Sequence, residues 1–318
     1  GLLDSGVAVP VLVRTLLAPA LWRVGDLWMH GKVTVAQEHR VTAVTEAVIQ
    51  VLMAGSTAER STARVLLTGP DGEWHILPGR MVALVLRQLG WDVFQLTPAL
   101  PPDDLLTLAR AEQAYVAGIS CSLPGNLVAA WQSVTALREA GFAVVAGGRT
   151  FDEFPGVAEA IGADGHARDP LQAHELLLGW VEQSPPGERP GTLLRRWAGL
   201  RSTWEATGRI VQDAAVLAVD MEGVALAGEV LRQDLTLMVM TAVSAALVDK
   251  PSILIQHIVW YQDLLAVGGI DTDVALGLLR CVGRVLPADA DDVRSAIREA
   301  VASAPEGPMA ADAPRTRQ

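Results

Sequence analysis

The 318-residue chain contains few cysteines, few aromatic residues and few positive charges for its length. Its two cysteines, Cys121 and Cys281, allow at most one disulfide and match no thiolate metal spacing, which excludes zinc ribbons and iron–sulfur clusters. The 25 Lys and Arg residues stand against 36 Asp and Glu, and the net charge of −11 argues against a surface that neutralises phosphates. We therefore expect a cytoplasmic protein with reduced cysteines and no nucleic acid as a direct partner.

Long apolar runs are also missing, and we expect no leader segment. The longest candidate span, Leu235–Val248, has fourteen residues and is too short to cross a bilayer as a helix. The chain opens Gly-Leu-Leu-Asp-Ser-Gly without a basic region, so no signal peptide is expected. Hydrophobic residues make up 50% of the chain and charged residues 19%, which supplies packed cores for two domains or more.

The first sixty residues have the periodicity of a helical hairpin. Apolar residues recur at steps of four, three and four positions: Leu17, Leu21, Val24 and Trp28. Gly31 can end this helix, and Thr34 with Gln37 has the form of a capping box that begins the next. The second helix continues to about Gly55 with a stripe of valines, Val41, Val44, Val48 and Val51. Residues 56–61 are polar and are expected to be a linker.

From residue 61 to residue 184, short β-branched runs alternate with helical segments. The expected strands are Val65–Thr68, Trp91–Leu96, Tyr115–Ile119 and Ala143–Ala146, with a weaker fifth at Asp164–His166. The expected helices are Arg80–Leu89, Pro102–Ala111, Leu127–Ala140, Val157–Ile161 and Pro170–Val181. This alternation predicts an α/β domain with a doubly wound, parallel sheet. Ligands would bind beyond the carboxyl ends of its strands, at the loops Gly69–Gly79, Ser120–Asn126 and Gly147–Thr150.

The remainder of the chain is expected to be helical. The segment Ser184–Gly191 is rich in Pro and Gly and predicts a linker at a domain boundary. Residues 192–304 carry no period-2 run and are interrupted at Lys250-Pro251, Gly268-Gly269 and Pro287, which is typical of an all-α domain. Residues 305–318 are rich in Ala, Pro and charge and are expected to be a disordered tail.

A histidine follows the first expected strand. The segment Gly69-Pro-Asp-Gly-Glu-Trp-His-Ile-Leu-Pro-Gly79 places His75 on a loop, two residues after the carboxylate of Glu73. Neither GxGxxG nor the P-loop spacing occurs, which disfavours the common nucleotide loops. An acid beside a histidine can hold the ring's tautomer and raise its basicity, as one metal–imidazole bond requires. The sequence leaves two interpretations open, a metal-ligating histidine and a solvated or capping one.

Three loops resemble those of the cobalamin-binding Rossmann-like domain, and they occur in that family's order: Glu73-Trp74-His75, Ser120-Cys121-Ser122-Leu123 and Gly147-Gly148. The resemblance implies that His75 displaces the cofactor's lower dimethylbenzimidazole base and ligates cobalt. It also implies that Ser120 and Ser122 line a slot for the displaced nucleotide tail, and that Gly147 and Gly148 leave room for the base. The usual His-x-x-Gly spacing is one residue longer here, because three residues rather than two lie between His75 and Gly79.

The hairpin carries a second motif, in which nine residues separate Trp28 from Glu38-His39. Because one expected helix ends near Gly31 and the next begins near Thr34, these side chains can converge on one ligand face. The alternative is a core tryptophan beside a solvated charged pair. Placed before a cobalamin domain, the motif resembles light-sensing cobalamin photoreceptors of the CarH type, in which Trp and Glu pack against the 5′-deoxyadenosyl group. In transcriptional relatives a histidine directly after the Trp can take the vacated position on cobalt; here Met29 follows and His30 is the candidate.

The C-terminal helices, around Lys250–Leu265, resemble the globin-like, bilin-binding domain of photocobilins. These couple a cobalamin domain to a linear tetrapyrrole such as biliverdin, which implies polar partners for its propionates and pyrrole N–H groups. His257 and Tyr261 are the candidate contacts, and the other available side chains are Arg195, Arg196, Arg201, Arg209 and Asp220. Cys281 is a candidate thioether site or, alternatively, a free buried cysteine. Simple core or dimer packing is the alternative interpretation of these helices.

Together these resemblances predict a photoreceptor rather than an enzyme. Adenosylcobalamin would be held between residues 1–60 and 61–184 with its cobalt on His75, and a bilin such as biliverdin within residues 192–304. Photolysis of the cobalt–carbon bond would change conformation or oligomeric state and signal to a partner protein or effector. We expect a homo-oligomer that binds no membrane. Two alternatives remain: a corrinoid methyl-shuttle protein of a methyltransferase system, and an interaction module that has lost cobalamin.

Overall fold

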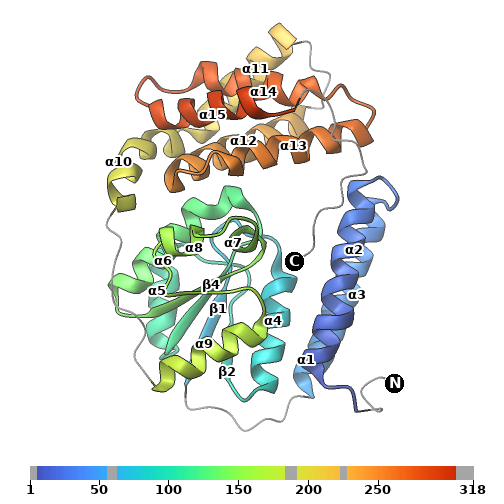
Figure 1. Ribbon diagram of the computed structural model, residues 1–318, viewed down its shortest axis with the longest axis vertical. Helices are drawn as coiled ribbons and strands as arrows, with labels where there is room; N and C mark the ends of the chain where they lie inside the picture. The colour runs from blue at the N-terminus through green and yellow to red at the C-terminus, as the bar shows by residue number, and fades with distance from the viewer. Residues whose placement is uncertain (1–5, 56–62, 183–191, 223–227, 306–318) are drawn as a thin grey trace. The chain divides into compact units, whose positions relative to one another are not determined.

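The computed structural model describes residues 6–55, 63–182, 192–222 and 228–305 (Figure 1). The two expected linkers, and the tail from residue 306, lie outside these described residues. Internal contacts divide the chain into two units. Unit 1 comprises residues 1–28 and 32–190, and unit 2 comprises residues 29–31 and 191–318.

Unit 1 begins with the predicted helical hairpin. Its first arm consists of α1 (Val9–Leu12), the π-helical turn η1 (Val13–Leu17) and α2 (Ala18–Met29), and its second arm is α3 (Val35–Ala54). Thr34 caps α3, because its hydroxyl accepts from the Gln37 N–H at 3.2 Å while the Gln37 side chain accepts from the Thr34 N–H at 2.8 Å. Gly31 has a φ of +64° where the chain turns between the arms. The capping box and the hairpin are confirmed.

The face of α3 that packs is one position away from the valine stripe read from the sequence. Val44 and Val51 are 57% and 73% exposed, whereas Ile49 and Leu52 are buried. The buried pair joins Leu12 and Val13 of the first arm in a core against α4 (Ile76–Gln88). Residues three or four apart share a helical face, so Ile49 and Leu52 form a stripe of their own, and packing on α4 selects it.

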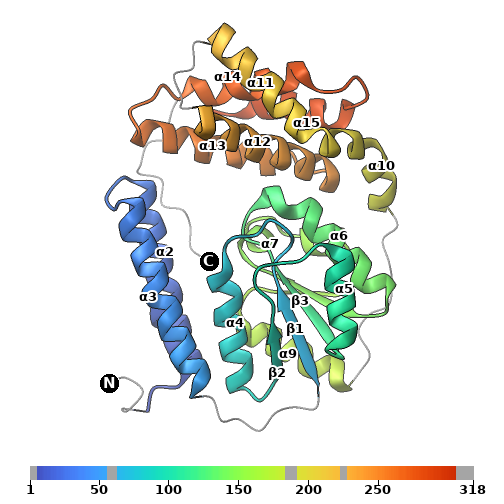
Figure 2. The same ribbon diagram turned by 180° about the vertical axis from the view of Figure 1, so that it is seen from behind.

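The rest of unit 1 is a parallel sheet with the order β2-β1-β3-β4-β5. The strands are β1 (Arg64–Thr68), β2 (Asp92–Gln95), β3 (Val116–Ser120), β4 (Ala143–Gly147) and β5 (Gly165–Ala167). Runs such as Val65-Leu66-Leu67 are buried on both sides because helices cover both faces of the sheet (Figures 1 and 2). The predicted doubly wound α/β fold, including the weak fifth strand, is confirmed.

Helices α4 and α9 (Pro170–Glu182) contact each other, as do α5 (Pro102–Ala111) and α6 (Leu127–Glu139). Short helical segments complete the connections: η2 (Pro124–Asn126), α7 (Arg149–Glu153) and α8 (Val157–Ala160). The first loop is shorter than the predicted Gly69–Gly79, because α4 begins directly after His75. Pro78 lies in the first turn of α4, where its missing N–H leaves no helical hydrogen bond unmade.

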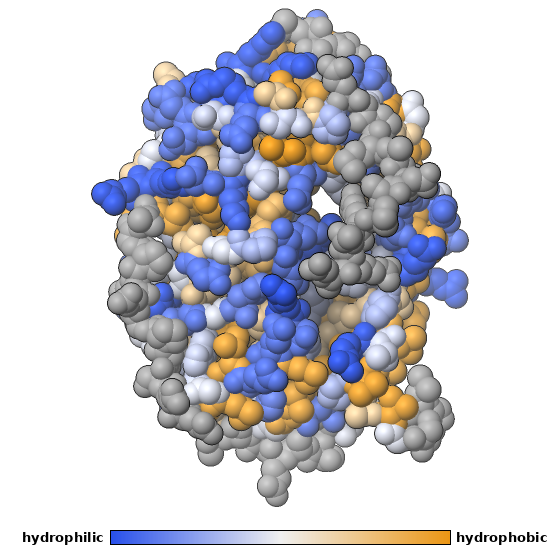
Figure 3. Space-filling model, in the orientation of Figure 1, coloured by the Kyte–Doolittle hydropathy of each residue, from blue (hydrophilic) through white to orange (hydrophobic). Residues whose placement is uncertain are grey.

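The described part of unit 2 from residue 192 onward contains helices and no strand, as predicted. These are α10 (Thr192–Glu205), α11 (Thr207–Glu222), α12 (Gly228–Val248), α13 (Ser252–Val267), α14 (Asp273–Val285) and α15 (Asp291–Ser303). Among described residues, α12 is long and apolar enough to cross a membrane, yet 56% of its apolar window is buried inside the protein. It contacts α10, α11, α13 and α15, which explains its composition as that of a core helix. Figure 3 shows hydrophilic and hydrophobic residues interspersed on the visible face.

Candidate functional site

The candidate site is built around the buried carboxylate of Glu73, on the loop after β1. The Glu73 side chain is only 2% exposed. Its Oε1 accepts hydrogen bonds from the backbone N–H of His75 at 3.0 Å and from His75 Nδ1 at 2.7 Å. Its Oε2 accepts from the backbone N–H groups of Ser122 at 2.8 Å and Leu123 at 3.3 Å, and from the Asn126 amide at 3.3 Å. One carboxylate therefore joins the loops that follow β1 and β3.

The electrostatics of Glu73 follow from these donors. Burial by itself raises its pKa, but the hydrogen bonds from His75 and Ser122, with the charge of His75, outweigh burial and lower the pKa. The Glu73 carboxylate is thus ionised at neutral pH and can only accept hydrogen bonds. The proton on Nδ1 of His75 is therefore fixed in place, and the Nε2 lone pair is left available.

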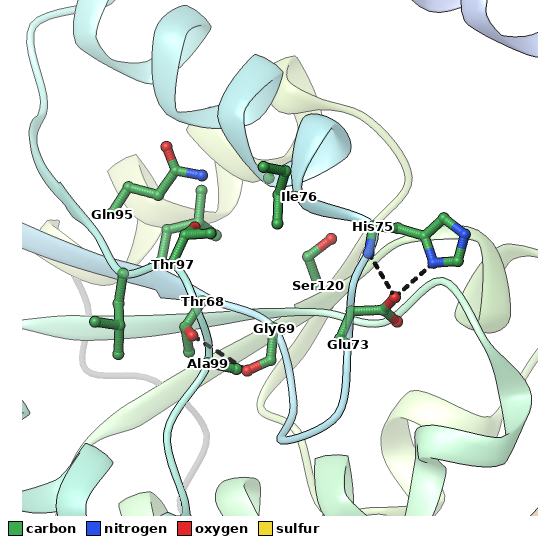
Figure 4. A pocket seen from close by; sticks show the side chains of 12 residues that line it. Thr68, Gly69, Glu73, His75, Ile76, Gln95, Thr97, Ala99 and Ser120 are labelled. Carbon is green, nitrogen blue, oxygen red and sulfur yellow. Dashed lines mark hydrogen bonds and ion pairs between the residues drawn. The ribbon is translucent and has the colours of Figure 1, made fainter. Parts of the chain in front are cut away.

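His75 has the properties that a metal-binding imidazole needs. Its side chain is 52% exposed, and Figure 4 shows the ring turned away from the pocket with Nδ1 toward Glu73. Nε2 has no partner within the described part of the chain, and a carboxylate on the opposite nitrogen is the usual support of a ligating histidine. The described residues contain no group of three or more His, Cys, Asp or Glu side chains arranged for a metal. His75 fits a metal whose remaining ligands come with a cofactor.

The other predicted residues of this edge have different surroundings. Trp74 is 84% exposed. Ser122 and Leu123 meet Glu73 through their backbone N–H groups, whereas Ser120 lines the pocket beside His75 (Figure 4). Asn126 was not among the predicted site residues. It lies directly before helix α6, on the loop after β3, and this position could have identified it.

Gly147 and Gly148 lie where neighbouring backbone approaches closely. A Cβ on Gly147 would lie 2.9 Å from the carbonyl oxygen of Ala167, and one on Gly148 would lie 2.6 Å from that of Cys121. Gly148 also has a φ of +100°. A side chain at either position would overlap neighbouring backbone, so the packing here requires glycine at both positions. Room for a cofactor base at these positions stays a prediction.

A pocket opens beside His75 at the carboxyl ends of β1 and β2. It is lined by Thr68 at the end of β1 and Gly69 after it, by Gln95 at the end of β2 and Thr97 after it, and by Ser120 (Figure 4). The first turn of α4 completes it. Gln95 and Thr97 were not among the predicted residues, because the predictions considered the loops after β1, β3 and β4 only.

On the hairpin, Glu38 and His39 contact each other. Glu38 accepts hydrogen bonds from His39 Nδ1 at 2.6 Å and from the Thr42 hydroxyl at 2.8 Å. Burial raises the pKa of Glu38, but these bonds and the charges of His39 and His75 together lower it, so Glu38 is within electrostatic reach of His75.

Trp22 of the hairpin contacts Arg149, the first residue of α7. The guanidinium of Arg149 lies 5.4 Å from the centre of the Trp22 ring, which is a cation–π distance. Trp28 is half-buried on α2 and His30 is exposed. The ligand contacts predicted for Glu38, His39 and Trp28 stay predictions.

Unit 2 contains a buried polar pair between α12 and α13. The Tyr261 hydroxyl donates to Asp234 Oδ2 at 2.6 Å, and Tyr261 is 2% exposed. Burial raises the pKa of Asp234, and burial together with Asp234 raises the pKa of Tyr261, which keeps the hydroxyl protonated. His257 stacks on Trp260 with ring centroids 5.6 Å apart. Asp234 was not predicted, although an acid directly before the apolar run Leu235–Val248 could have identified it.

The remaining bilin candidates lie on the surface of unit 2. Arg195, Arg201, Arg209 and Asp220 are exposed, and Arg196 forms an ion pair with Asp249 at 2.7 Å. Cys281 is buried and forms no disulfide, and its role as a thioether site stays a prediction.

Residues 63–175 match the family model described as a B12 binding domain, and residues 1–53 match a second model with the same description. The HTH-type transcriptional repressor CarH of Myxococcus xanthus is 32% identical over 149 residues, which cover 46% of this chain and 50% of the repressor. These matches support a cobalamin-binding, CarH-like protein. The chain spans about half the length of this curated relative.

Among solved structures, the monomethylamine corrinoid protein of Methanosarcina barkeri has a TM-score of 0.47 at 16% identity, covering 56% of this chain and 86% of its own. A cobalamin-binding protein from Desulfitobacterium hafniense DCB-2 has a TM-score of 0.35 at 18% identity, covering 50% of this chain and 77% of its own. The parallel Rossmann-like fold rests on the strand pairing itself and on the B12-binding matches.

Proposed function

We propose that this chain is a light sensor that binds adenosylcobalamin, with His75 as the protein ligand of cobalt. The observation that carries the proposal is the His75 ring, held through Nδ1 by buried Glu73 and presenting Nε2 outward. The matches to B12 binding domains support cobalt in a corrin as the metal. The similarity to the repressor CarH supports a light-sensing role rather than a role in methyl transfer.

Bound adenosylcobalamin would supply a cobalt–carbon bond that light breaks. The protein would bind the cofactor and change conformation when the adenosyl group leaves. Glu73 keeps the His75 ring oriented. We assign the contacts that cover the adenosyl group to Trp28, Glu38 and His39 of the hairpin. A hairpin that packs differently with and without that group is a two-state element biased by a ligand.

The base of the hairpin is anchored and its tip is the part we expect to respond. Leu12 and Ile49 belong to a core shared with α4, and Glu46 on α3 forms a 2.8 Å ion pair with Arg80 on α4. The ligand-facing residues we assign, Trp28 and Glu38, lie on either side of the turn at the opposite end. We propose that the signal passes to a partner protein or to a second copy of the chain rather than to nucleic acid, because the net charge is −11.

The test is absorption spectroscopy of the full chain with adenosylcobalamin or methylcobalamin, in the dark and after green light. A light sensor should prefer the adenosyl form and change its spectrum irreversibly on illumination. Trp28→Ala should abolish that preference, and Trp22→Ala, on the same helix, should keep it. Equal binding of both forms, with no effect of Trp28→Ala, would instead support the methyl-shuttle alternative and overturn the proposal.

We also propose that unit 2 binds a bilin such as biliverdin. The observation that favours it is a set of polar groups on α12 and α13. Tyr261 and Asp234 form a hydrogen bond, and the buried atoms Gln262 Oε1 and Thr241 Oγ1 have no hydrogen-bond partner among the described residues. Buried polar atoms without partners are costly, and a tetrapyrrole with N–H and carbonyl groups is chemically able to satisfy them. His257 is the second predicted contact.

This second proposal is tested by expression with biliverdin. A red absorption band should appear, and Tyr261→Phe should weaken or shift it. Tyr115→Phe is the matched control, because the Tyr115 hydroxyl donates to the Trp180 carbonyl at 2.6 Å in unit 1. Absence of the red band, or equal effects of the two variants, contradicts the proposal.

A further inference from the structure

The chain has two tyrosines, and their hydroxyls donate to acceptors of different basicity. The Tyr261 hydroxyl donates to a carboxylate, Oδ2 of Asp234, at 2.6 Å. The Tyr115 hydroxyl donates to a backbone carbonyl, that of Trp180, at the same distance of 2.6 Å. A carboxylate can take up a proton at moderate pH, whereas an amide carbonyl cannot. Of the two tyrosines, Tyr261 is therefore the one whose hydrogen-bond partner is able to accept its proton.

Burial makes proton transfer important for Tyr261. This side chain is 2% exposed, whereas Tyr115 is 40% exposed. A buried phenol that lost an electron and kept its proton would place an uncompensated positive charge in the interior, which is costly. When the proton passes to Asp234 instead, the pair changes from one negative charge to none. Burial raises the pKa of Asp234, so its surroundings already favour the protonated acid.

Trp260 adds a second oxidisable ring beside the pair. The ring centroids of Trp260 and Tyr261 lie 6.5 Å apart with 33° between the ring planes, a spacing typical of packed aromatic rings. On its other contact, Trp260 stacks on His257 at 5.6 Å. Trp260 is half-buried while Tyr261 is buried. Trp260 is thus the ring that an oxidant outside the helices reaches more easily.

We propose that Tyr261 and Asp234 form a redox site that donates one electron, with Trp260 as the relay to the oxidant. The oxidant is a tetrapyrrole that has lost one electron to dioxygen after absorbing light, and this part rests on the proposed binding of a bilin in unit 2. The oxidised tetrapyrrole takes an electron from Trp260, and the Trp260 radical cation takes one from Tyr261.

The last transfer is coupled to a proton. As the electron leaves Tyr261, its O–H bond breaks and the proton moves along the hydrogen bond to Oδ2 of Asp234. A neutral tyrosyl radical remains beside the protonated acid, and the tetrapyrrole has regained its electron. The site would therefore protect a bound chromophore against photobleaching.

The experiment uses the full chain without a tetrapyrrole. The oxidant is tris(bipyridine)ruthenium(III), generated by a laser flash in the presence of a sacrificial electron acceptor, and the tyrosyl radical is followed by transient absorption and by electron paramagnetic resonance of frozen samples. The wild-type chain should form a long-lived tyrosyl radical. Tyr261→Phe should lose this signal, and Tyr115→Phe, the matched control, should keep it. Because the chain has two tyrosines, these variants assign the signal.

Two further variants test the partners of Tyr261. Asp234→Asn keeps an oxygen that accepts the hydrogen bond but removes the base, and should slow formation of the tyrosyl radical about a hundredfold, a typical contribution of a positioned base. Trp260→Phe replaces the relay with a ring that is harder to oxidise, and should also slow radical formation. A wild-type rate in Asp234→Asn overturns proton transfer to Asp234, and a wild-type rate in Trp260→Phe overturns the relay.

A wild-type chain without a tyrosyl radical overturns the redox site, as does a signal that Tyr115→Phe loses and Tyr261→Phe keeps. The ruthenium complex replaces the bilin in this test, so its outcome is independent of the red absorption band expected with biliverdin. A Tyr261 radical in a chain that develops no red band supports the redox site and overturns the bilin proposal, and with it the tetrapyrrole as the oxidant.

Discussion

Two histidine–carboxylate pairs lie at the carboxyl edge of the sheet, and their burial is opposite. In the first pair the acid Glu73 is 2% exposed and the His75 ring is 52% exposed. In the second pair the His166 side chain is 17% exposed and Asp152 is 38% exposed, with 3.0 Å between Nε2 and Oδ1. A buried acid with an outward ring leaves a ring nitrogen exposed to a metal, whereas in the second pair the ring is the less exposed partner.

The pKa shifts of the two acids differ in the same sense. Burial raises the pKa of Asp152 even though the hydrogen bond and charge of His166 lower it. The several donors around Glu73 overcome the same burial effect and lower its pKa. The comparison teaches that the number of donors to the acid, rather than the presence of a histidine, makes the pair a support for a ligand.

Removal of the two acids should have unequal effects on stability. Glu73→Ala leaves the N–H groups of Ser122 and Leu123 and the amide of Asn126 without their acceptor, and should cost about 3–5 kcal/mol. Asp152→Ala removes one partly exposed partner and should cost less than about 1 kcal/mol. Urea unfolding of both variants measures this, and similar losses would contradict the comparison.

His257 has no acid partner among the described residues, and the effect of its burial is tested by the pH dependence of stability. Burial lowers the pKa of His257 to about 4, so the folded protein favours its neutral ring while the unfolded chain takes up a proton near the ordinary value of 6.5. Stability should therefore fall as the pH drops from 6.5 toward 4, by at most about 1.4 kcal/mol per pH unit.

The variant His257→Gln should remove this part of the pH dependence of unfolding. His39→Gln is its control, because the His39 side chain is 73% exposed. An unchanged pH profile in His257→Gln would show that His257 is not held neutral by burial.

The third pair, Glu38 with His39, should be the weakest. Its 2.6 Å ion pair is on the surface of the hairpin, with His39 73% and Glu38 32% exposed. Glu38→Gln should change the free energy of unfolding by less than about 0.5 kcal/mol, because exposed ion pairs contribute little. A loss as large as that of Glu73→Ala would mean that the histidine partner, and not burial of the acid, controls stability.

Much of the fold was predictable because local signals agree with tertiary packing. Helix α5 has the predicted bounds, Pro102–Ala111, since Pro at the first position and the acids after it favour a helix start. Four of the five strands were found from runs with β-branched residues, and the fifth, expected at Asp164–His166, was a weaker prediction that the sheet bears out. The packed face of α3 was not predicted, because that helix carries two apolar stripes and contact with α4 determines which of them is buried.

The site was predictable only in part, for a related reason. The Glu73–His75 pair is local in sequence and could be read directly. The bonds from Glu73 to Ser122 and Leu123 use backbone N–H groups, which no side-chain pattern identifies. Gln95 and the Asp234–Tyr261 pair depend on which elements become neighbours, and periodicity along one element does not contain that information.

The central claim, that His75 binds cobalt, is tested most directly by dark absorption spectra of the full chain with adenosylcobalamin in His75→Ala and His166→Ala. The two variants remove histidines of the two opposite pairs. The account predicts that His75→Ala loses the spectrum of histidine-ligated cobalt while His166→Ala keeps it. An unchanged spectrum in His75→Ala would contradict it.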